Sequence, residues 1–258
     1  MNSNIKVYVI SCAYKANRFA INCIESVAQQ TVVPETHFYI DDMSEDENKT
    51  TNAVKEIVEK NNYAHVKLIT NTTRQHRLKN INDIIATIDD PEAIVMLLDG
   101  DDWFSVKNAI ETIQNYYLTK TSFEYVYTNW MYSHSGELGI SRPIPGNDFN
   151  GYKDPWVTSA MATFKVKTFK KIPKSNFLDW NGDWIKMGSD PAYVLPILHM
   201  LKARDDDYRS VGFVNYPIYV YQFLENTGRP RSDSFGNYYR ELAHKTSRFI
   251  RERGFLNE

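Results

Sequence analysis

The stretch AIVMLLDGDDWF, residues 93–104, decides the fold. Its apolar part, residues 94–98, runs directly into the acidic turn DGDD at residues 99–102. An apolar run of this length that ends at a turn signal is typical of a strand buried on both faces of a sheet. Ligands of open α/β sheets bind at the carboxyl ends of the strands. The sequence therefore predicts an α/β protein with three carboxylates at the ligand-binding edge of its sheet.

The acidic turn has two interpretations. Oxygen-rich clusters suit a hard divalent cation, which keeps some waters and uses one or two carboxylates together with the substrate's phosphates. A metal ion held over a diphosphate is the chemistry that we favour. The alternative is a solvated Asp-Gly turn, which is common between elements of secondary structure.

Length and composition restrict the class of protein. The chain has 258 residues, of which 42% are hydrophobic and 14% aromatic, enough for one large domain with a substantial core. The 30 basic and 32 acidic residues nearly balance, so charge does not favour nucleic acid or an anionic membrane as partner, although it excludes neither. No run of 18 apolar residues is present, which predicts no transmembrane segment.

The start of the chain and its cysteines predict a cytoplasmic protein. Residues 1–6 are polar and lead directly into a strand, which argues against a signal peptide. Cys12 and Cys23 are the only cysteines, and neither belongs to a group with zinc-binding spacing. We therefore expect reduced thiols that pack in the interior.

Strands and helices alternate through the first 120 residues. Helices that separate strands imply right-handed crossovers and a mainly parallel sheet. The second strand ends at Asp41 and Asp42, so both acid pairs would face one crevice if the strands share an edge. Ser44 and Glu47 resemble a capping box for the second helix. The predicted strands cover residues 5–10, 37–40, 66–69 and 94–98, and the helices cover residues 19–29, 44–59, 78–88 and 106–118.

The second half of the chain is less regular. Residues 133–154 are rich in Gly, Pro, Ser and Asn, and a loop of that length predicts an acceptor loop or a lid. All five tryptophans lie between residues 103 and 184. Core packing explains most tryptophans, but Trp156, Trp180 and Trp184 would also suit stacking against sugar rings. The predicted strands cover residues 124–128, 157–164 and 211–221, and the helices cover residues 191–201 and 238–253.

Four blocks of the sequence together resemble the glycosyltransferases of family 2, which have the GT-A fold. Residues 7–31 resemble the family's opening strand, turn and helix, and residues 38–48 resemble its Val-Asp-Asp-Gly-Ser block. Residues 71–82 resemble its Asn-rich helix start, and residues 97–103 its Asp-x-Asp block. The resemblance extends from about residue 7 to residue 226.

The resemblance implies a fold, a reaction and its partners. The fold would be a single α/β domain with a Rossmann-like, mostly parallel central sheet flanked by helices. Its donor-binding half would cover residues 1–120, its acceptor-binding half residues 121–235, and a C-terminal helix residues 236–258. The reaction would transfer a sugar from a UDP- or GDP-sugar to a hydroxyl acceptor, expected to be a carbohydrate, with inversion. The cofactor would be Mn²⁺ or Mg²⁺.

The same resemblance assigns roles to individual residues. Tyr14 would stack on the nucleotide base, Asp41 would accept a hydrogen bond from it, and Arg74 could reach the base or the phosphates. Asp101 would be the direct metal ligand, and Asp99 would lie nearer the ribose and share the metal site. Asp102 would support these ligands from behind.

The base is assigned with an open alternative. Gly188-Ser189-Asp190, followed by the apolar segment 191–198, resembles the block with the catalytic aspartate, which makes Asp190 the general base. Ser189 replaces the family's usual acidic residue, so Asp183 remains a competitor. Two further departures from the family pattern bear on donor preference. Lys15 replaces a common Asn, and His76 replaces a Gly.

Basic residues later in the chain have both a functional and a plain interpretation. Arg229 and Arg231 could close over the diphosphate, or could belong to a solvated basic loop. The lysines between residues 165 and 174 could steer an anionic acceptor, or could form a solvated face.

Two other functions compete with sugar transfer. A nucleotidyltransferase also combines an α/β sheet with carboxylate-held metal, but it usually has a Gly-rich basic signature near the first strand, and residues 9–20 contain no glycine. A catalytically inactive sugar- or nucleotide-binding module with the same fold is the second alternative.

Overall fold

A computed structural model describes residues 5–222 and 234–258. They form one eight-stranded sheet with the strand order β3-β2-β1-β4-β7-β6-β8-β5. The strands are β1 (Val7–Ala13), β2 (Thr36–Asp41), β3 (Val66–Thr70), β4 (Ile94–Leu97), β5 (Trp103–Phe104), β6 (Tyr125–Tyr132), β7 (Ala162–Lys165) and β8 (Val211–Tyr221). The helices are α1 (Asn17–Ala28), α2 (Lys49–Asn61), α3 (Arg77–Ala86), α4 (Ala109–Thr119), α5 (Val166–Lys170), the 3₁₀ helix η1 (Lys174–Phe177), α6 (Asp190–Asp205) and α7 (Ser234–Arg253).

The register of the sheet brings the acidic turns to one edge. β1, β2, β3 and β4 are parallel, with Ala13 opposite Asp41 and Asp41 opposite Thr70. Ile10 lies opposite Leu97, so β4 ends at the same edge as β1 and β2. β6 and β8 are also parallel, while β7 is antiparallel to β4 and β6, and β5 to β8. This confirms the predicted mostly parallel α/β sheet and places both acid pairs at its carboxyl edge.

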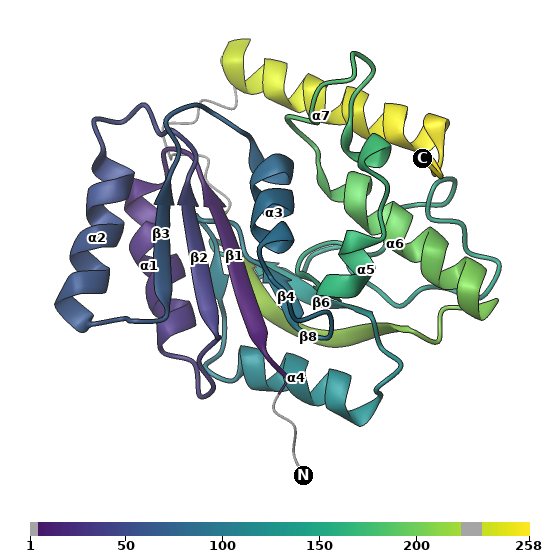
Figure 1. Ribbon diagram of the computed structural model, residues 1–258, viewed down its shortest axis with the longest axis horizontal. Coiled ribbons are helices and arrows are strands. Elements are labelled where there is room, and N and C mark those ends of the chain that lie inside the picture. The colour runs from purple at the N-terminus through teal and green to yellow at the C-terminus, as the bar shows by residue number, and fades with distance from the viewer. Residues whose placement is uncertain (1–4, 223–233) are drawn as a thin grey trace.

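Helices cover the sheet in two layers (Figure 1). One apolar cluster contains Ile24 of α1 and Ile113 of α4, while the other contains Ile81 of α3 and Leu198 of α6. Residues of β1 alternate between them, because successive side chains of a strand point to opposite faces: Val9 belongs to the first cluster and Ile10 to the second. The central strands are therefore buried on both faces, as their apolar sequences predict.

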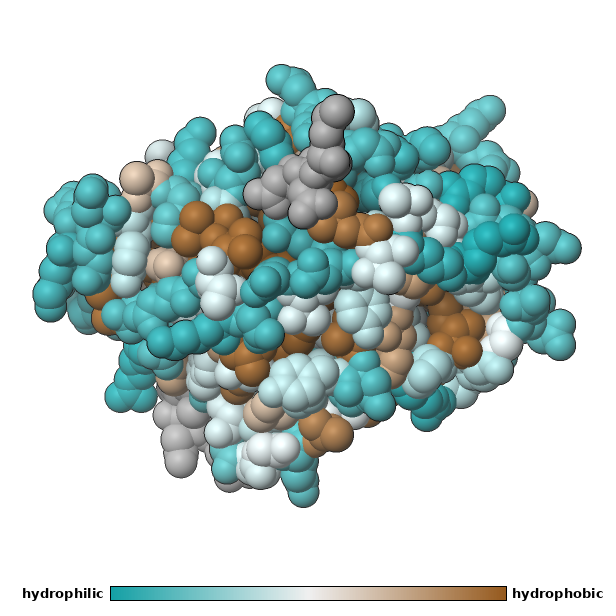
Figure 2. Space-filling view, turned by 90° about the horizontal axis from the view of Figure 1, so that it is seen from below, coloured by the Kyte–Doolittle hydropathy of each residue, from teal (hydrophilic) through white to brown (hydrophobic). Residues whose placement is uncertain are grey.

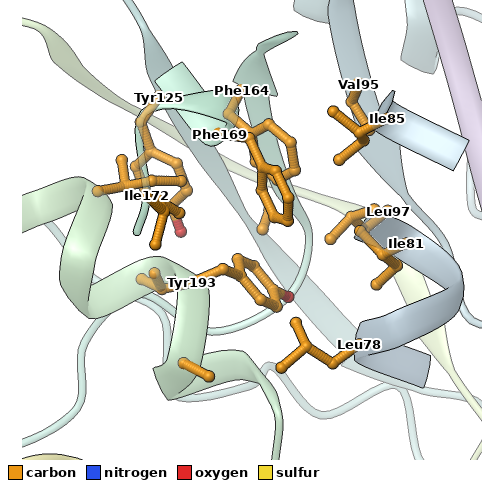
Figure 3. Packing of buried hydrophobic residues seen from close by; sticks show 14 of the residues in the cluster. Leu78, Ile81, Ile85, Val95, Leu97, Tyr125, Phe164, Phe169, Ile172 and Tyr193 are labelled. Atoms are coloured by element: carbon orange, nitrogen blue, oxygen red, sulfur yellow. The ribbon is translucent and has the colours of Figure 1, made fainter. Parts of the chain in front are cut away.

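The second cluster joins the two halves of the chain. Figure 3 shows the rings of Phe164 and Phe169 between Tyr125 and the side chains of α3, with Tyr193 reaching from α6 toward Leu78. All of these residues are buried. Burial of each large apolar side chain stabilises the fold by about 1.5–3 kcal/mol. This packing fixes the N-terminal end of α6 close to the start of α3.

Helix α7 packs on the acceptor-side half. Ile250 and Thr246 are buried. Arg251 donates to the carbonyl oxygens of Gly151 and Asp154 at 3.0 and 2.9 Å. Arg253 donates to the carbonyl oxygen of Leu178 at 2.7 Å. The helix is therefore tied to the rest of the domain by apolar contacts and by arginine hydrogen bonds.

The molecular surface is mixed. In the view of Figure 2, apolar residues form separate small areas between hydrophilic ones. No helix among the described residues is both long and apolar enough to cross a membrane.

Some local predictions were wrong. The capping box is absent: α2 begins only at Lys49, and Ser44 Oγ instead accepts the amide of Lys15 at 2.8 Å. The carboxylate of Asp46 accepts the amide of Thr50 at 3.0 Å and so serves the first turn of the helix. The strand predicted over residues 157–164 is shorter, since β7 begins at Ala162. The short elements β5, α5 and η1 were not predicted.

Candidate active site

The acidic turn after β4 is a packed part of the structure. Gly100 is buried, its amide donates to the carbonyl of Cys12 at 3.0 Å, and a Cβ at this position would lie 2.6 Å from that of Ala13. Asp102 is 1% exposed. It accepts the hydroxyl of Tyr219 and, at 2.7 Å, the amide of Gln222. Burial, reinforced by the carboxylates of Asp101 and Asp99, raises the pKa of Asp102. The solvated-turn interpretation is therefore wrong for Gly100 and Asp102.

Arg77 links the acidic turn to the predicted general base. Its Nε donates to Asp99 Oδ1 at 2.6 Å, and its Nη1 donates to Asp190 Oδ1 at 2.8 Å. The side chain of Arg77 is 24% exposed. Its pKa lies well above the ordinary value, since the carboxylates of Asp99 and Asp190 more than offset the effect of burial. Arg77 is the first residue of α3, and sequence reasoning did not single it out.

Asp190 lies at the first residue of α6 and is exposed to solvent. Its side chain is 57% exposed, and its Oδ1 also accepts the hydroxyl of Tyr193 at 2.5 Å. The amino end of a helix favours a negative charge. The loop before it includes Gly188, whose φ is +65° and whose added Cβ would lie 2.8 Å from the carbonyl oxygen of Ala243 in α7. Glycine therefore permits the close approach of α7 to the loop that carries Asp190.

The competing aspartate lies elsewhere. The side chain of Asp183 is 63% exposed, and Oδ2 lies 3.9 Å from Lys186 Nζ. Its backbone amide closes a turn by donating to Asp179 Oδ1 at 3.1 Å. Arg77 thus brings Asp190, and not Asp183, to the acidic turn.

The carboxylates after β2 hold backbone in place. Asp41 is 2% exposed, and its two oxygens accept the amide of Ser44 at 3.0 Å and the hydroxyl of Thr51. Asp42 accepts the side-chain amide of Asn71 and the backbone amides of residues 75 and 76, each at 2.8 Å. Burial raises the pKa of Asp42, but these hydrogen bonds outweigh it, so the pKa lies below its ordinary value.

The side chains of Tyr14 and Arg74 form a cation–π pair beside these acids. The guanidinium of Arg74 lies 3.6 Å from the centre of the Tyr14 ring and 5.8 Å from that of Tyr239 in α7. Arg74 Nε is 3.9 Å from Asp42 Oδ2. The hydroxyl of Tyr14 donates to Glu45 at 3.1 Å. The predicted base-stacking tyrosine thus already has a planar cation on its ring.

The two departures from the family pattern adopt unusual backbone conformations. Lys15 has φ 56°, and His76 has φ 64° with ψ 161°. The conformation of His76 is nearly restricted to glycine and costs a non-glycine residue about 1–3 kcal/mol. The backbone therefore retains the conformation that Gly and Asn favour, although the side chains have changed.

The donor atoms of Asp99 and Asp101 suit a hard divalent cation. In the described parts of the chain, no group of three or more His, Cys, Asp or Glu side chains is arranged to hold a metal. A cation that is shared with substrate phosphates needs only one or two carboxylates. Asp99 uses Oδ1 for Arg77, and Asp101 is partly exposed beside it. The residues present therefore fit such a shared site.

The three predicted acceptor tryptophans all contact cations. Lys245 Nζ lies 3.8 Å above the ring of Trp180, which is 37% exposed. Trp184 stacks on Phe177 at 5.9 Å, with Lys79 and Lys174 near its ring. Trp156 has Arg251 at 5.9 Å. Trp180 thus presents the most accessible ring of the three.

Three of the lysines between residues 165 and 174 have structural partners. Lys165 and Lys167 pair with Glu92, and Lys170 Nζ donates to the carbonyl oxygen of Ile88 at 2.7 Å. These contacts favour a structural role over steering of an anionic acceptor. Arg229 and Arg231 lie outside the described residues.

Comparison with known families agrees with this arrangement. The family model described as "Glycosyl transferase family 2" matches residues 8–172, well over half of the chain. The chain belongs to this family. The resemblance predicted from the four sequence blocks is thereby confirmed, and the chain has the GT-A fold of this family. No curated protein matches the chain.

Solved structures show the same fold at low sequence identity. TarS residues 1–349 from S. aureus, in complex with UDP-GlcNAc, has a TM-score of 0.59 and 15% identity, with 92% of this chain and 64% of that chain covered. Mannosyltransferase PcManGT from Pyrobaculum calidifontis, in complex with GDP-Man and Mn²⁺, has a TM-score of 0.56 and 16% identity, with 88% and 59% covered. The chain therefore spans less than two thirds of the length of either structure.

Sequence reasoning missed the residues that join the site together. Arg77, Tyr193 and Tyr219 lie on three different elements and follow no motif that the blocks define. One signal was available: Arg77 is a basic residue at the predicted start of a helix at the carboxyl edge of the sheet. Its partners, 22 and 113 residues away, could not be found without the fold.

Proposed function

We propose that this glycosyltransferase transfers a sugar from a nucleotide-diphosphate sugar to a hydroxyl acceptor, with inversion. The observation that carries the proposal is the cluster of Asp99, Arg77 and Asp190, which places a solvent-exposed carboxylate beside the acidic turn of the sheet. Structures of similar fold in complex with UDP-GlcNAc and GDP-Man support a nucleotide-sugar donor.

The donor's nucleotide would bind at the carboxyl ends of β1 and β2. Its base would stack against the Tyr14 and Arg74 pair, and Asp41 would accept a hydrogen bond from it. Both oxygens of Asp41 already accept one bond, but each can accept a second. Asp99 would bind the ribose through Oδ2, since Oδ1 accepts Arg77.

Asp101, with Asp99, would hold a Mn²⁺ or Mg²⁺ ion shared with the donor phosphates. When bound, such an ion neutralises the charge that develops on the leaving diphosphate. Asp102 would hold the turn in shape through Tyr219 and Gln222.

Asp190 would act as the general base. The acceptor's oxygen forms a bond to the anomeric carbon while its proton passes to the carboxylate of Asp190. The bond from that carbon to the phosphate oxygen breaks, and its electron pair leaves with the nucleotide diphosphate. One base on the face opposite the leaving group suffices for this single displacement. Because the acceptor attacks that face, the configuration at the anomeric carbon would be inverted. Trp156, Trp180 and Trp184 remain proposed contacts for a carbohydrate acceptor.

Two other functions were considered for this fold. A catalytically inactive binding module would bind a nucleotide sugar without hydrolysing it. The family match gives no support to a nucleotidyltransferase.

A cytoplasmic location also remains a prediction. It rests on the two free cysteines, whose thiol pKa values are raised by burial.

The proposal is tested by calorimetric titration of UDP, GDP and CDP and of their sugar derivatives, each with and without Mn²⁺, followed by assays of donor hydrolysis. We expect one nucleotide to bind in a metal-dependent way and its sugar derivative to be hydrolysed slowly. Binding without hydrolysis would favour the inactive module. Absence of binding by every nucleotide would refute the proposal.

A further inference from the structure

Arg77 connects two parts of the site that lie far apart in the sequence. Its guanidinium contacts Asp99 of the acidic turn through Nε and Asp190 of α6 through Nη1. The same Nη1 lies 3.3 Å from both Ser189 Oγ and the hydroxyl oxygen of Tyr193. Because the guanidinium is planar and its donors are fixed relative to one another, these contacts restrict the position of each carboxylate.

One oxygen of Asp190 receives all of the support. Oδ1 accepts both Arg77 Nη1 and the hydroxyl of Tyr193, whereas Oδ2 accepts no hydrogen bond from residues 5–222 or 238–258, whose side chains the structure describes. A carboxylate held through one oxygen presents the other in a fixed direction. The exposed side chain of Asp190 can therefore offer Oδ2 to a ligand in solvent.

The Tyr193 hydroxyl is itself fixed by packing. The ring is 1% exposed and belongs to the cluster with Phe164 and Phe169, at centroid distances of 6.1 and 6.3 Å. Figure 3 shows the ring reaching from α6 toward Leu78, the neighbour of Arg77 in α3. A rigid core side chain therefore defines where Oδ1 of Asp190 lies.

We infer that Arg77 is a positioning residue for the transfer reaction, which, together with Tyr193, presents Asp190 Oδ2 to the acceptor hydroxyl. This inference rests on the proposed function. Arg77 does not exchange a proton with the acceptor; that proton passes to Asp190 while the donor's glycosidic oxygen leaves with the diphosphate. Through Asp99, the same arginine ties the orientation of the base to the turn that would bind the donor.

The test is a double-mutant cycle on turnover. Arg77→Gln in the wild-type background should lower kcat by about 10²-fold, because misplacing a catalytic group by about 1 Å can cost that much. In the Asp190→Asn background, Arg77→Gln should cause almost no further loss, since the group that it positions is already gone. Tyr193→Phe should give a smaller loss of kcat with the same dependence on Asp190.

Two further variants separate positioning from charge and from fold. Arg77→Lys keeps a cation but has one nitrogen for two carboxylates, so donor affinity should be largely retained while kcat stays low. Arg209→Gln is the matched control, because Arg209 is exposed and contacts its sequence neighbours Asp205 and Asp207; its kcat should equal that of wild type. If Arg77→Gln does not fold, Arg77→Lys and Tyr193→Phe are carried through the same cycle with Asp190→Asn.

Losses of kcat that multiply in the double variant would overturn the inference, as would an Arg77 variant with wild-type kcat and only a raised donor KM. Donor binding and hydrolysis by the wild-type protein are measured in the same series. If the wild type neither binds nor hydrolyses any donor, the proposed function itself fails. If it does both and the cycle is additive, only the positioning role fails.

Discussion

The loops after β2 and β4 both end a buried parallel strand with acidic residues, yet their carboxylates do different work. After β2, Asp41 and Asp42 are buried and accept hydrogen bonds from neighbouring backbone and side chains. After β4, Asp102 is held in the same way, but Asp99 and Asp101 remain partly exposed. An acidic pair at the edge of a sheet can therefore shape a loop or face a ligand.

This difference explains how the site is built. The buried acids fix the backbone at residues 44, 75 and 76. Residues 75 and 76 directly follow Arg74, and Ser44 accepts the amide of Lys15, next to Tyr14. The exposed acids can then meet a ligand without reorganisation of that backbone. Arg77 is a cation that joins two of the acids. It binds Asp99 at the edge of the sheet and Asp190 of α6, which is 113 residues further along the chain.

The largest effect on stability should come from Asp42→Ala. The substitution leaves three buried or partly buried donors without an acceptor, and because an unsatisfied buried group costs about 1–3 kcal/mol, the free energy of unfolding should fall by about 3 kcal/mol. Urea denaturation measures the change, with exposed Asp89→Ala as the control. A loss no larger than that of the control would contradict the structural role of Asp42.

The same variant has a defined pH dependence. The pKa of Asp42 is lowered in the folded protein, so its contribution to stability is complete above the ordinary value of about 3.9 and is lost as the pH falls through the lowered value. The difference in unfolding free energy between wild type and Asp42→Ala should therefore shrink below about pH 4. A constant difference from pH 7 to the lowest accessible pH would be inconsistent with this assignment.

Asp101→Ala should affect activity much more than stability. Its unfolding free energy should fall much less than that of Asp42→Ala, because Asp101 is partly exposed. Metal-dependent nucleotide binding should disappear, and turnover should fall at least about 10²-fold, since Lewis-acid stabilisation contributes several kcal/mol. If nucleotide binding in this variant still required metal, the assignment of Asp101 as the metal ligand would be wrong.

The smallest effect should come from Arg74→Ala. A cation over an aromatic ring contributes about 0.5–1 kcal/mol at an exposed site, so the nucleotide Kd should rise about two- to fivefold. Calorimetry on this variant and on Arg209→Ala provides the comparison. Tighter nucleotide binding in Arg74→Ala would instead mean that Arg74 covers the face of Tyr14 that the base needs.

The sequence predicted those parts of the molecule that depend on local pattern. The apolar run before Asp99 gave a central strand, and the alternation of elements gave the parallel sheet, because period and length are properties of neighbouring residues. The position of Asp190 at the start of α6 followed from the proline at its first turn.

The parts that depend on long-range contacts were beyond the sequence. The bonds from Arg77 to Asp99 and Asp190, and from Tyr219 to Asp102, join residues that no local rule relates. Local rules also failed at Ser44, because its hydroxyl oxygen accepts the backbone amide of Lys15, in the loop after β1, and so does not cap the predicted helix. Burial decides the role of each acid, and burial follows only from the folded chain.

The central claim, that the cluster of Asp99, Arg77 and Asp190 performs the chemistry, is tested most directly by comparing Asp190→Asn with Asp183→Asn. The measurement is the turnover of a bound nucleotide sugar, with donor affinity determined on the same samples. We predict that Asp190→Asn binds the donor like wild type but loses about 10²–10⁴-fold in kcat, as expected for loss of a general base, whereas Asp183→Asn keeps wild-type turnover. Full activity in Asp190→Asn, or a comparable loss in Asp183→Asn alone, would contradict the account.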